Sequence, residues 1–88
     1  MIESYSFSVS EVEYPILQKL CPSDFPFDYK TFAQREKEGI ASMLTQGMRV
    51  IPVRVSVNDF MEWCKKTNVQ PNNTSRCKYA IMVGKQLE

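Results

Sequence analysis

Polar and cationic side chains gather toward the C-terminal end of the sequence, in and just before the segment NVQPNNTSRCKYA at residues 68–80. Lysine and arginine side chains pair with phosphate, whereas amides, hydroxyls and guanidinium groups hydrogen-bond to base edges. These residue types could contact DNA or RNA, or could form only a polar loop between two packing helices. They occur at Asn72, Asn73, Ser75, Arg76, Lys78, Lys65 and Lys66.

The distribution of charge favours an anionic partner. Residues 1–46 hold four cationic and seven anionic side chains. Residues 47–87 hold seven cationic and two anionic side chains. The net charge of the whole chain is only +1. A basic half on a nearly neutral chain is what an anionic partner would meet, although so short a chain also acquires such a split by chance.

The aromatic segment CPSDFPFDY at residues 21–29 supports an alternative interpretation. Exposed aromatic side chains and free sheet edges are features of surfaces that bind other proteins. Phe25, Phe27 and Tyr29 are therefore the candidate residues of a protein–protein interaction module, such as an adaptor or inhibitor. The same three side chains would equally serve as core packing against the helix that follows.

The sequence does not favour catalysis. It contains no histidine, the commonest general base and metal ligand, and its three glycines are too far apart to form a phosphate-binding loop. Cys21, Cys64 and Cys77 lack metal-ligand spacing. We therefore expect a protein that is not an enzyme and has no metal and no cofactor. Cys64 and Cys77 are predicted to be buried neighbours.

The location predicted from the sequence is the cytoplasm. An odd number of cysteines indicates a reducing compartment, and the acidic N-terminus lacks the features of a secretory signal. The longest apolar run, AIMV at residues 80–83, is far shorter than a membrane span, so we expect no membrane partner.

The stretch at residues 60–79 resembles the helix-turn-helix motif of bacterial DNA-binding proteins. Cys64 stands where that motif has a small residue, Asn68 at its left-handed turn and Val69 at the buried aliphatic position that follows. Pro71 suits the first turn of the second helix. Two threonines replace residues that are usually aliphatic in the motif, and the resemblance covers about a quarter of the chain.

The resemblance makes the polar and cationic residues named above the candidate nucleic-acid-binding residues, and it implies a role for each. Asn72, Asn73 and Ser75 would approach a DNA groove at the N-terminus of the second helix, and Arg76 would reach a guanine edge or the backbone. The three lysines would contact phosphate. So few contacts imply weak binding by one copy, and we therefore expect a homodimer or a partner subunit.

The first half of the chain contains three predicted elements. YSFSVS at residues 5–10 alternates as a half-buried strand, with serines on one face. A short helix with Pro15 in its first turn follows. The clearest helix spans residues 29–46, capped by Asp28 and ended by Gly47 in the left-handed conformation. Its predicted buried stripe comprises Tyr29, Phe32, Ala33, Glu36, Ile40, Met43 and Leu44.

The second half begins with a predicted strand at residues 48–56, which Pro52 confines to a sheet edge because proline lacks an N–H donor. Ser56 is the predicted cap of a helix with an apolar stripe of Val57, Phe60, Trp63 and Cys64. Residues 79–83 fit either a helix or a third strand.

These elements predict an α+β fold. We expect one small domain over residues 1–86, with three to four helices and a two- or three-stranded sheet that includes the edge strand. Residues 87–88 are interpreted as a cloning scar.

Overall fold

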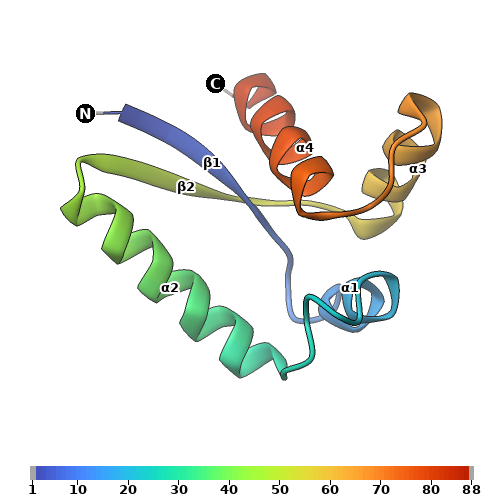
Figure 1. The fold of residues 1–88 in the computed structure, drawn as a ribbon, viewed down its shortest axis with the longest axis horizontal. Coiled ribbons are helices and arrows are strands. Elements are labelled where there is room, and N and C mark those ends of the chain that lie inside the picture. Colours follow the sequence, from blue (N-terminus) through green and yellow to red (C-terminus); the bar gives the residue numbers. More distant parts are fainter. Residues whose placement is uncertain (1, 88) are drawn as a thin grey trace.

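The computed structural model describes residues 2–87, so the predicted scar lies partly outside the described range. The elements follow the order β1 (Ile2–Ser8), α1 (Tyr14–Leu20), α2 (Tyr29–Thr45), β2 (Met48–Arg54), α3 (Val57–Thr67) and α4 (Asn73–Gln86) (Figure 1). The α+β class, the four helices and the small single domain are confirmed. Residues 79–83 belong to α4, so the described chain has a sheet of two strands.

The two strands are parallel and pair along their whole length, from Ile2 opposite Met48 to Ser8 opposite Arg54. Parallel pairing needs a crossover, which α1 and α2 provide. Because the sheet has two strands within residues 2–87, each strand has one edge that no other described strand pairs with. The prediction that Pro52 lies in an edge strand is therefore confirmed.

The hydrogen bonds fix which residues of β1 point away from β2. The amide of Ile2 donates to the carbonyl of Gly47 at 3.2 Å, and the carbonyl of Ser8 accepts from the amide of Val55 at 3.0 Å. In a parallel ladder, one residue directs its N–H and C=O to the neighbouring strand and the next directs both away. The even-numbered residues of β1 therefore bond β2, and the odd-numbered residues face its free edge.

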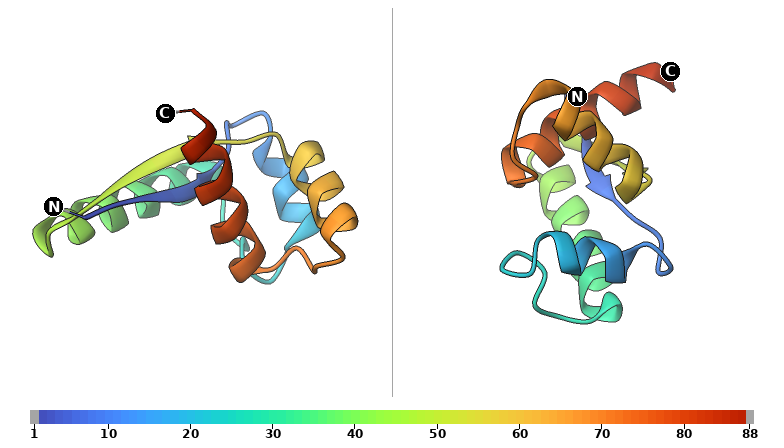
Figure 2. Two further views of the ribbon diagram at one scale, coloured as in Figure 1. Left: turned by 90° about the horizontal axis from the view of Figure 1, so that it is seen from above. Right: turned by 90° about the vertical axis from the view of Figure 1, so that its right-hand side faces the viewer.

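The two long helices cover opposite faces of the sheet and different strands. Helix α4 packs mainly on β1, whereas α2 packs mainly on β2 (Figures 1 and 2). On the α4 face, Gly84 lies directly against the ring of Tyr5. Each strand is therefore well covered on one face and less well covered on the other.

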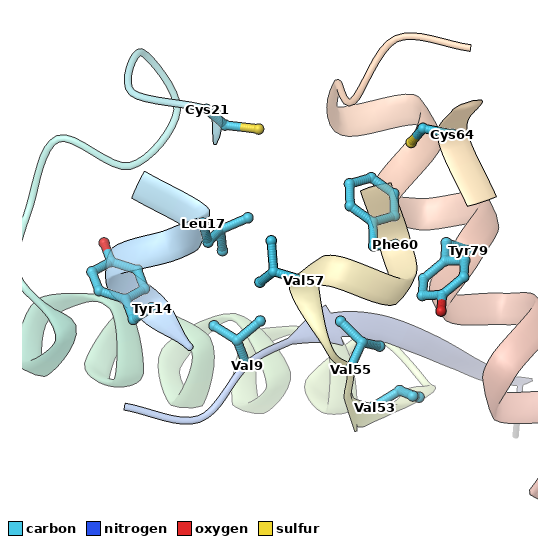
Figure 3. Packing of buried hydrophobic residues seen from close by; sticks show 10 residues of the cluster. All are labelled: Val9, Tyr14, Leu17, Cys21, Val53, Val55, Val57, Phe60, Cys64 and Tyr79. Carbon is cyan, nitrogen blue, oxygen red and sulfur yellow. The ribbon is translucent and has the colours of Figure 1, made fainter. Parts of the chain in front are cut away.

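The buried core lies where the chain leaves the strands, between α1, α3 and the start of α4 (Figure 3). Phe60 is fully buried and contacts the ring of Phe7 with centroids 4.9 Å apart. The predicted stripe of α3 is confirmed for Val57, Phe60 and Cys64, and Trp63 is half-buried against Tyr79.

The predicted helix caps are confirmed. The Asp28 side chain accepts from the amide of Thr31 at 2.9 Å, and the Ser56 side chain accepts from the amide of Asp59 at 3.4 Å. Gly47 follows α2 with a φ of +83°, the left-handed conformation predicted for it.

The predicted buried stripe of α2 is wrong in its extent. No residue of α2 is buried, and Leu44 is 50% exposed. The physical reason is the lateral position of the helix, which covers β2 and leaves one side of its apolar surface without a neighbouring element.

Candidate functional site

An apolar hollow of about 370 Å³ lies between α2 and the sheet. We call it the aromatic groove. Its walls come from the connection before α2, from one side of α2 and from both strands. The lining residues are Ser6, Phe7, Phe25, Phe27, Phe32, Arg35, Glu36, Gly39, Ile40, Met43 and Val50.

The groove exists because a helix with an apolar stripe faces a strand with small polar side chains. Ser6 and Ser8 occupy the face of β1 opposite to that of Tyr5 and Phe7, because side chains alternate along a strand. Serine is too short to fill the space beneath α2, which is displaced toward β2. The apolar surface of Ile40 therefore remains only half-buried.

Hydrogen bonds from α1 hold the aromatic wall of the groove in place. The hydroxyl of Tyr14 donates to the Phe27 carbonyl at 2.7 Å, and the Gln18 amide donates to the same oxygen at 2.8 Å. Burial raises the pKa of Tyr14, so this hydroxyl keeps its proton as a donor. The guanidinium of Arg35 covers the Phe27 ring, 4.5 Å from its centroid. The backbone of Phe27 is thus held by α1 and its ring is covered by a side chain of α2.

A second hollow, of about 490 Å³, adjoins the first, and we call it the edge hollow. It is lined by Tyr5, Ser6, Phe7, Asp24, Phe25, Asn73, Arg76 and Cys77. The two hollows share three lining residues, which are Ser6, Phe7 and Phe25. Because no residue of β2 lines the edge hollow, the two meet at the free edge of β1.

The structure corrects the role predicted for Arg76. Its side chain is only 7% exposed, and its guanidinium donates to the Asp24 carboxylate at 2.8 Å and to the Cys21 thiol at 3.3 Å. It also lies over the Phe25 ring, 4.9 Å from the centroid. Arg76 therefore anchors the connection after α1 to α4, and it is not available to reach a guanine.

Ser75 is likewise buried, and its hydroxyl donates to the carbonyl of Gln70. The side chain of Asn72 caps α4 by accepting from the amide of Ser75 at 3.0 Å. The predicted approach of Ser75 to a groove of DNA is therefore wrong, since its hydroxyl stabilises the turn before α4. Asn73 is exposed and lines the edge hollow.

The remaining candidate residues are on the surface. Lys65 and Lys66 lie in the last turn of α3, and Lys78 lies on α4; all three are exposed. Of the aromatic candidates, Phe25 and Phe27 line the aromatic groove, whereas Tyr29 packs on Tyr14 with ring centroids 5.6 Å apart. Tyr29 is not among the lining residues.

The turn between α3 and α4 agrees with the motif at one position and departs from it at two. Asn68 has a φ of +55°, the left-handed conformation predicted for it. Val69 is 38% exposed, so its predicted burial is wrong. Pro71 precedes the cap residue Asn72 and lies outside the first turn of α4. The resemblance to a helix-turn-helix stays a prediction.

The cysteines are arranged differently from the prediction. Cys77 is exposed on α4, whereas Cys21 and Cys64 are buried. Burial raises the pKa of both buried thiols, which disfavours the thiolate. Among residues 2–87, no three His, Cys, Asp or Glu side chains lie close enough together to hold a metal ion.

Sequence reasoning missed the α2 side of the aromatic groove, formed by Phe32, Ile40 and Met43. A signal was present, because the predicted stripe of α2 requires an apolar partner surface and the predicted strand at residues 5–10 offers serines on one face. The ion pair between Arg76 and Asp24 joins residues far apart in the chain, and no local pattern indicates it.

Comparisons with protein-family models, with curated proteins and with solved structures find no match for this chain. None of the helices in the described range combines the length and the apolar character that crossing a bilayer requires.

Proposed function

We propose that this chain is a non-catalytic binding domain that holds an apolar segment of a partner protein in the aromatic groove. The observation that carries the proposal is the groove itself, where Phe25, Phe27 and Ile40 line a hollow on the surface of a folded domain. Solvent-exposed apolar hollows of this kind are typical of surfaces that bind other proteins. Arg35 and Glu36 add charged groups to the lining.

The total exposed surface supports a bound partner. The chain exposes 5988 Å². A compact monomer of 10.2 kDa exposes about 5,300 Å², so the excess is roughly 700 Å². One partner in a standard protein–protein interface contributes about 800 Å². The excess is spread over the whole chain, and its size is comparable to the area that one partner contributes to such an interface.

The proposal places the domain in the cytoplasm, because Cys21, Cys64 and Cys77 are all free thiols, as expected in a reducing compartment.

The test is selection of a displayed library of random peptides on the purified protein. Peptides that bind the groove should lose about tenfold or more in affinity on Ile40→Glu, which puts a charge into the apolar lining. The matched control is Ala41→Glu, which puts the same charge at an exposed neighbouring position outside the lining. Thermal melts of both variants check that they fold. Equal binding to both variants would contradict the proposal.

Nucleic-acid binding is the alternative proposal, supported by the exposed residues Lys65, Lys66, Lys78 and Asn73. Titration with random-sequence duplex DNA at about 50 and 200 mM salt tests it, because phosphate contacts predict a steep loss of affinity over that range. If DNA binds in this way, and Lys65→Glu with Lys66→Glu abolishes binding, the alternative replaces the groove proposal. Absence of binding at the lower salt concentration removes it.

A further inference from the structure

We infer that the partner segment binds as an extended strand added to the free edge of β1, which makes it the third strand of the sheet. This inference rests on the proposed function and specifies how the segment is held. Strand addition to a sheet edge provides affinity through main-chain hydrogen bonds and specificity through alternate side chains.

The two free edges of the sheet differ in their ability to accept a strand. Along β1, the N–H and C=O groups of Glu3, Tyr5 and Phe7 point away from β2, as the hydrogen-bond pattern requires. Along β2, Pro52 stands at an outward-facing position because its register partner is Ser6, an inward-bonding residue. Proline has no N–H, and it is a common device for blocking strand addition at an edge. Only β1 therefore keeps all its outward donors.

The edge that can accept a strand is therefore not the one on the strand that the sequence identifies as an edge strand. From the sequence, Pro52 predicts that the strand at residues 48–56 is an edge strand. The register shows that the proline nitrogen occupies the outward side of β2 and weakens it as a template. The strand without a proline, β1, is the better template.

The free edge of β1 lies where the aromatic groove meets the edge hollow. Both hollows are lined by Ser6, Phe7 and Phe25, one on the α2 face of the sheet and the other beside α4. A strand added there would have one neighbouring strand for its backbone and one hollow for the side chains of each face. The site therefore offers backbone and side-chain contacts together.

The two hollows define the chemistry of the segment. Side chains of an added strand alternate between the two faces of the sheet. Those on the α2 face meet Phe27, Phe32 and Ile40, which favour large apolar groups. Those on the other face meet Asp24 and Asn73, which favour small or hydrogen-bonding groups. The segment is therefore extended, with an apolar residue at every second position.

A second copy of this chain fits the edge less well than a lone strand. Helix α4 lies over β1, and its Gly84 contacts Tyr5 near the middle of the strand. In antiparallel pairing of two β1 strands centred on Tyr5, the two strands would be only about 4.8 Å apart. The two α4 helices, each lying over its own β1, would then be brought together on the same face of the sheet. Packed helices need about 8–10 Å between their axes. A segment that brings no helix of its own avoids this conflict.

The first test uses the tightest-binding peptide from the displayed library and follows amide hydrogen exchange in the protein. Saturating peptide should slow exchange at Tyr5 and Phe7 by about tenfold or more, because their N–H groups become hydrogen-bonded. Ser4 and Ser6, already bonded to β2, should change little. N-methylation along the peptide should weaken binding at every second position, where the N–H faces β1.

The second test is a pair of protein variants. Glu3→Pro removes one outward N–H, and Glu3→Ala keeps it; both lose the exposed pair with Arg49, which spans 3.4 Å. We expect Glu3→Pro to weaken the peptide by about tenfold, the effect of roughly one hydrogen bond, and Glu3→Ala to leave affinity nearly unchanged. Equal affinities for the two variants would overturn the inference.

The outcomes separate this inference from the proposed function. Peptides that depend on Ile40 but leave exchange at Tyr5 and Phe7 unchanged would overturn strand addition and support the groove alone. Slowed exchange that depends on protein concentration without peptide would identify a second copy as the occupant and overturn the inference. Failure to select any peptide would overturn both.

Discussion

The hydroxyl of Tyr14 and the backbone carbonyl of Phe27 lie 2.7 Å apart and join α1 to the connection that precedes α2. Tyr14 is buried, whereas the Phe27 ring reaches the aromatic groove. A core residue thus helps to position a groove residue, together with the Gln18 amide that donates to the same oxygen. The stability of the domain and the shape of the groove are therefore coupled at this point.

Tyr14→Phe should lower the free energy of unfolding by about 1–2 kcal/mol, because the buried donor is lost and the ring is kept. Urea denaturation measures the change. Tyr29→Phe is the matched control, since Tyr29 packs through its ring on Tyr14 and Phe32 and should change stability by less than about 0.5 kcal/mol. Equal losses of unfolding free energy in the two variants would show that the hydrogen bond of the Tyr14 hydroxyl does not stabilise the fold.

Gly84→Ala should destabilise the domain by about 1–3 kcal/mol, because a methyl group there would overlap the Tyr5 ring, within 2.5 Å of its Cγ. Gly39→Ala, with no atom within 4 Å of the added carbon, should stabilise α2 by up to about 1 kcal/mol through helix propensity. Thermal melts of the two variants should shift in opposite directions. A stabilising Gly84→Ala would contradict the close approach of α4 to β1.

Ser8 and Ser75 are both buried serines, but of their two hydroxyl groups only that of Ser75 has a hydrogen-bond partner. Ser8→Ala should leave stability unchanged or raise it by up to about 1 kcal/mol, since an unpaired buried hydroxyl is removed. Ser75→Ala should cost about 1–2 kcal/mol, because the Gln70 carbonyl loses its donor. Chemical denaturation distinguishes the two, and a larger loss for Ser8→Ala would contradict this assignment.

The cap at Asp28 predicts a dependence of stability on pH. The hydrogen bonds from Thr31 lower the pKa of the Asp28 carboxyl below its ordinary value of 3.8. A lowered pKa in the folded state means that the ionised carboxylate stabilises the fold, and that this contribution is lost as pH falls through the folded pKa. The melting temperature of Asp28→Ala should therefore lie below that of the natural chain above about pH 5, and the gap should narrow toward about pH 3. A constant gap over this range would contradict the role of the charge.

The sequence predicts elements well where the signal is local. Asp28 and Gly47 bound α2 because a cap and a left-handed glycine act over one turn, and the stripe of α3 around Phe60 is buried as its spacing indicates. The strand prediction at Pro52 is correct for the same reason, since the missing N–H is a property of one residue.

The sequence is less informative where partners are distant. The sequence predicts that Arg76 is a surface cation like Lys78. In the structure its guanidinium is buried against Asp24, Cys21 and Phe25. The parallel register and the lateral position of α2 are also non-local. The register and the position of α2 determine which strand edge can accept a further strand and where the groove lies. The proposed site therefore depends on contacts between distant segments, which no single segment of the sequence predicts.

Parallel pairing also affects how the domain folds. Glu3 and Arg49, which face each other across the two strands, are 46 positions apart in the chain. During synthesis, β1 therefore emerges long before β2, and both edges of β1 stay without strand hydrogen bonds until β2 appears. Sheet formation should be the slow step relative to the local helices, since distant contacts close large loops. The N-terminal strand is thus the segment most exposed to mispairing in the nascent chain.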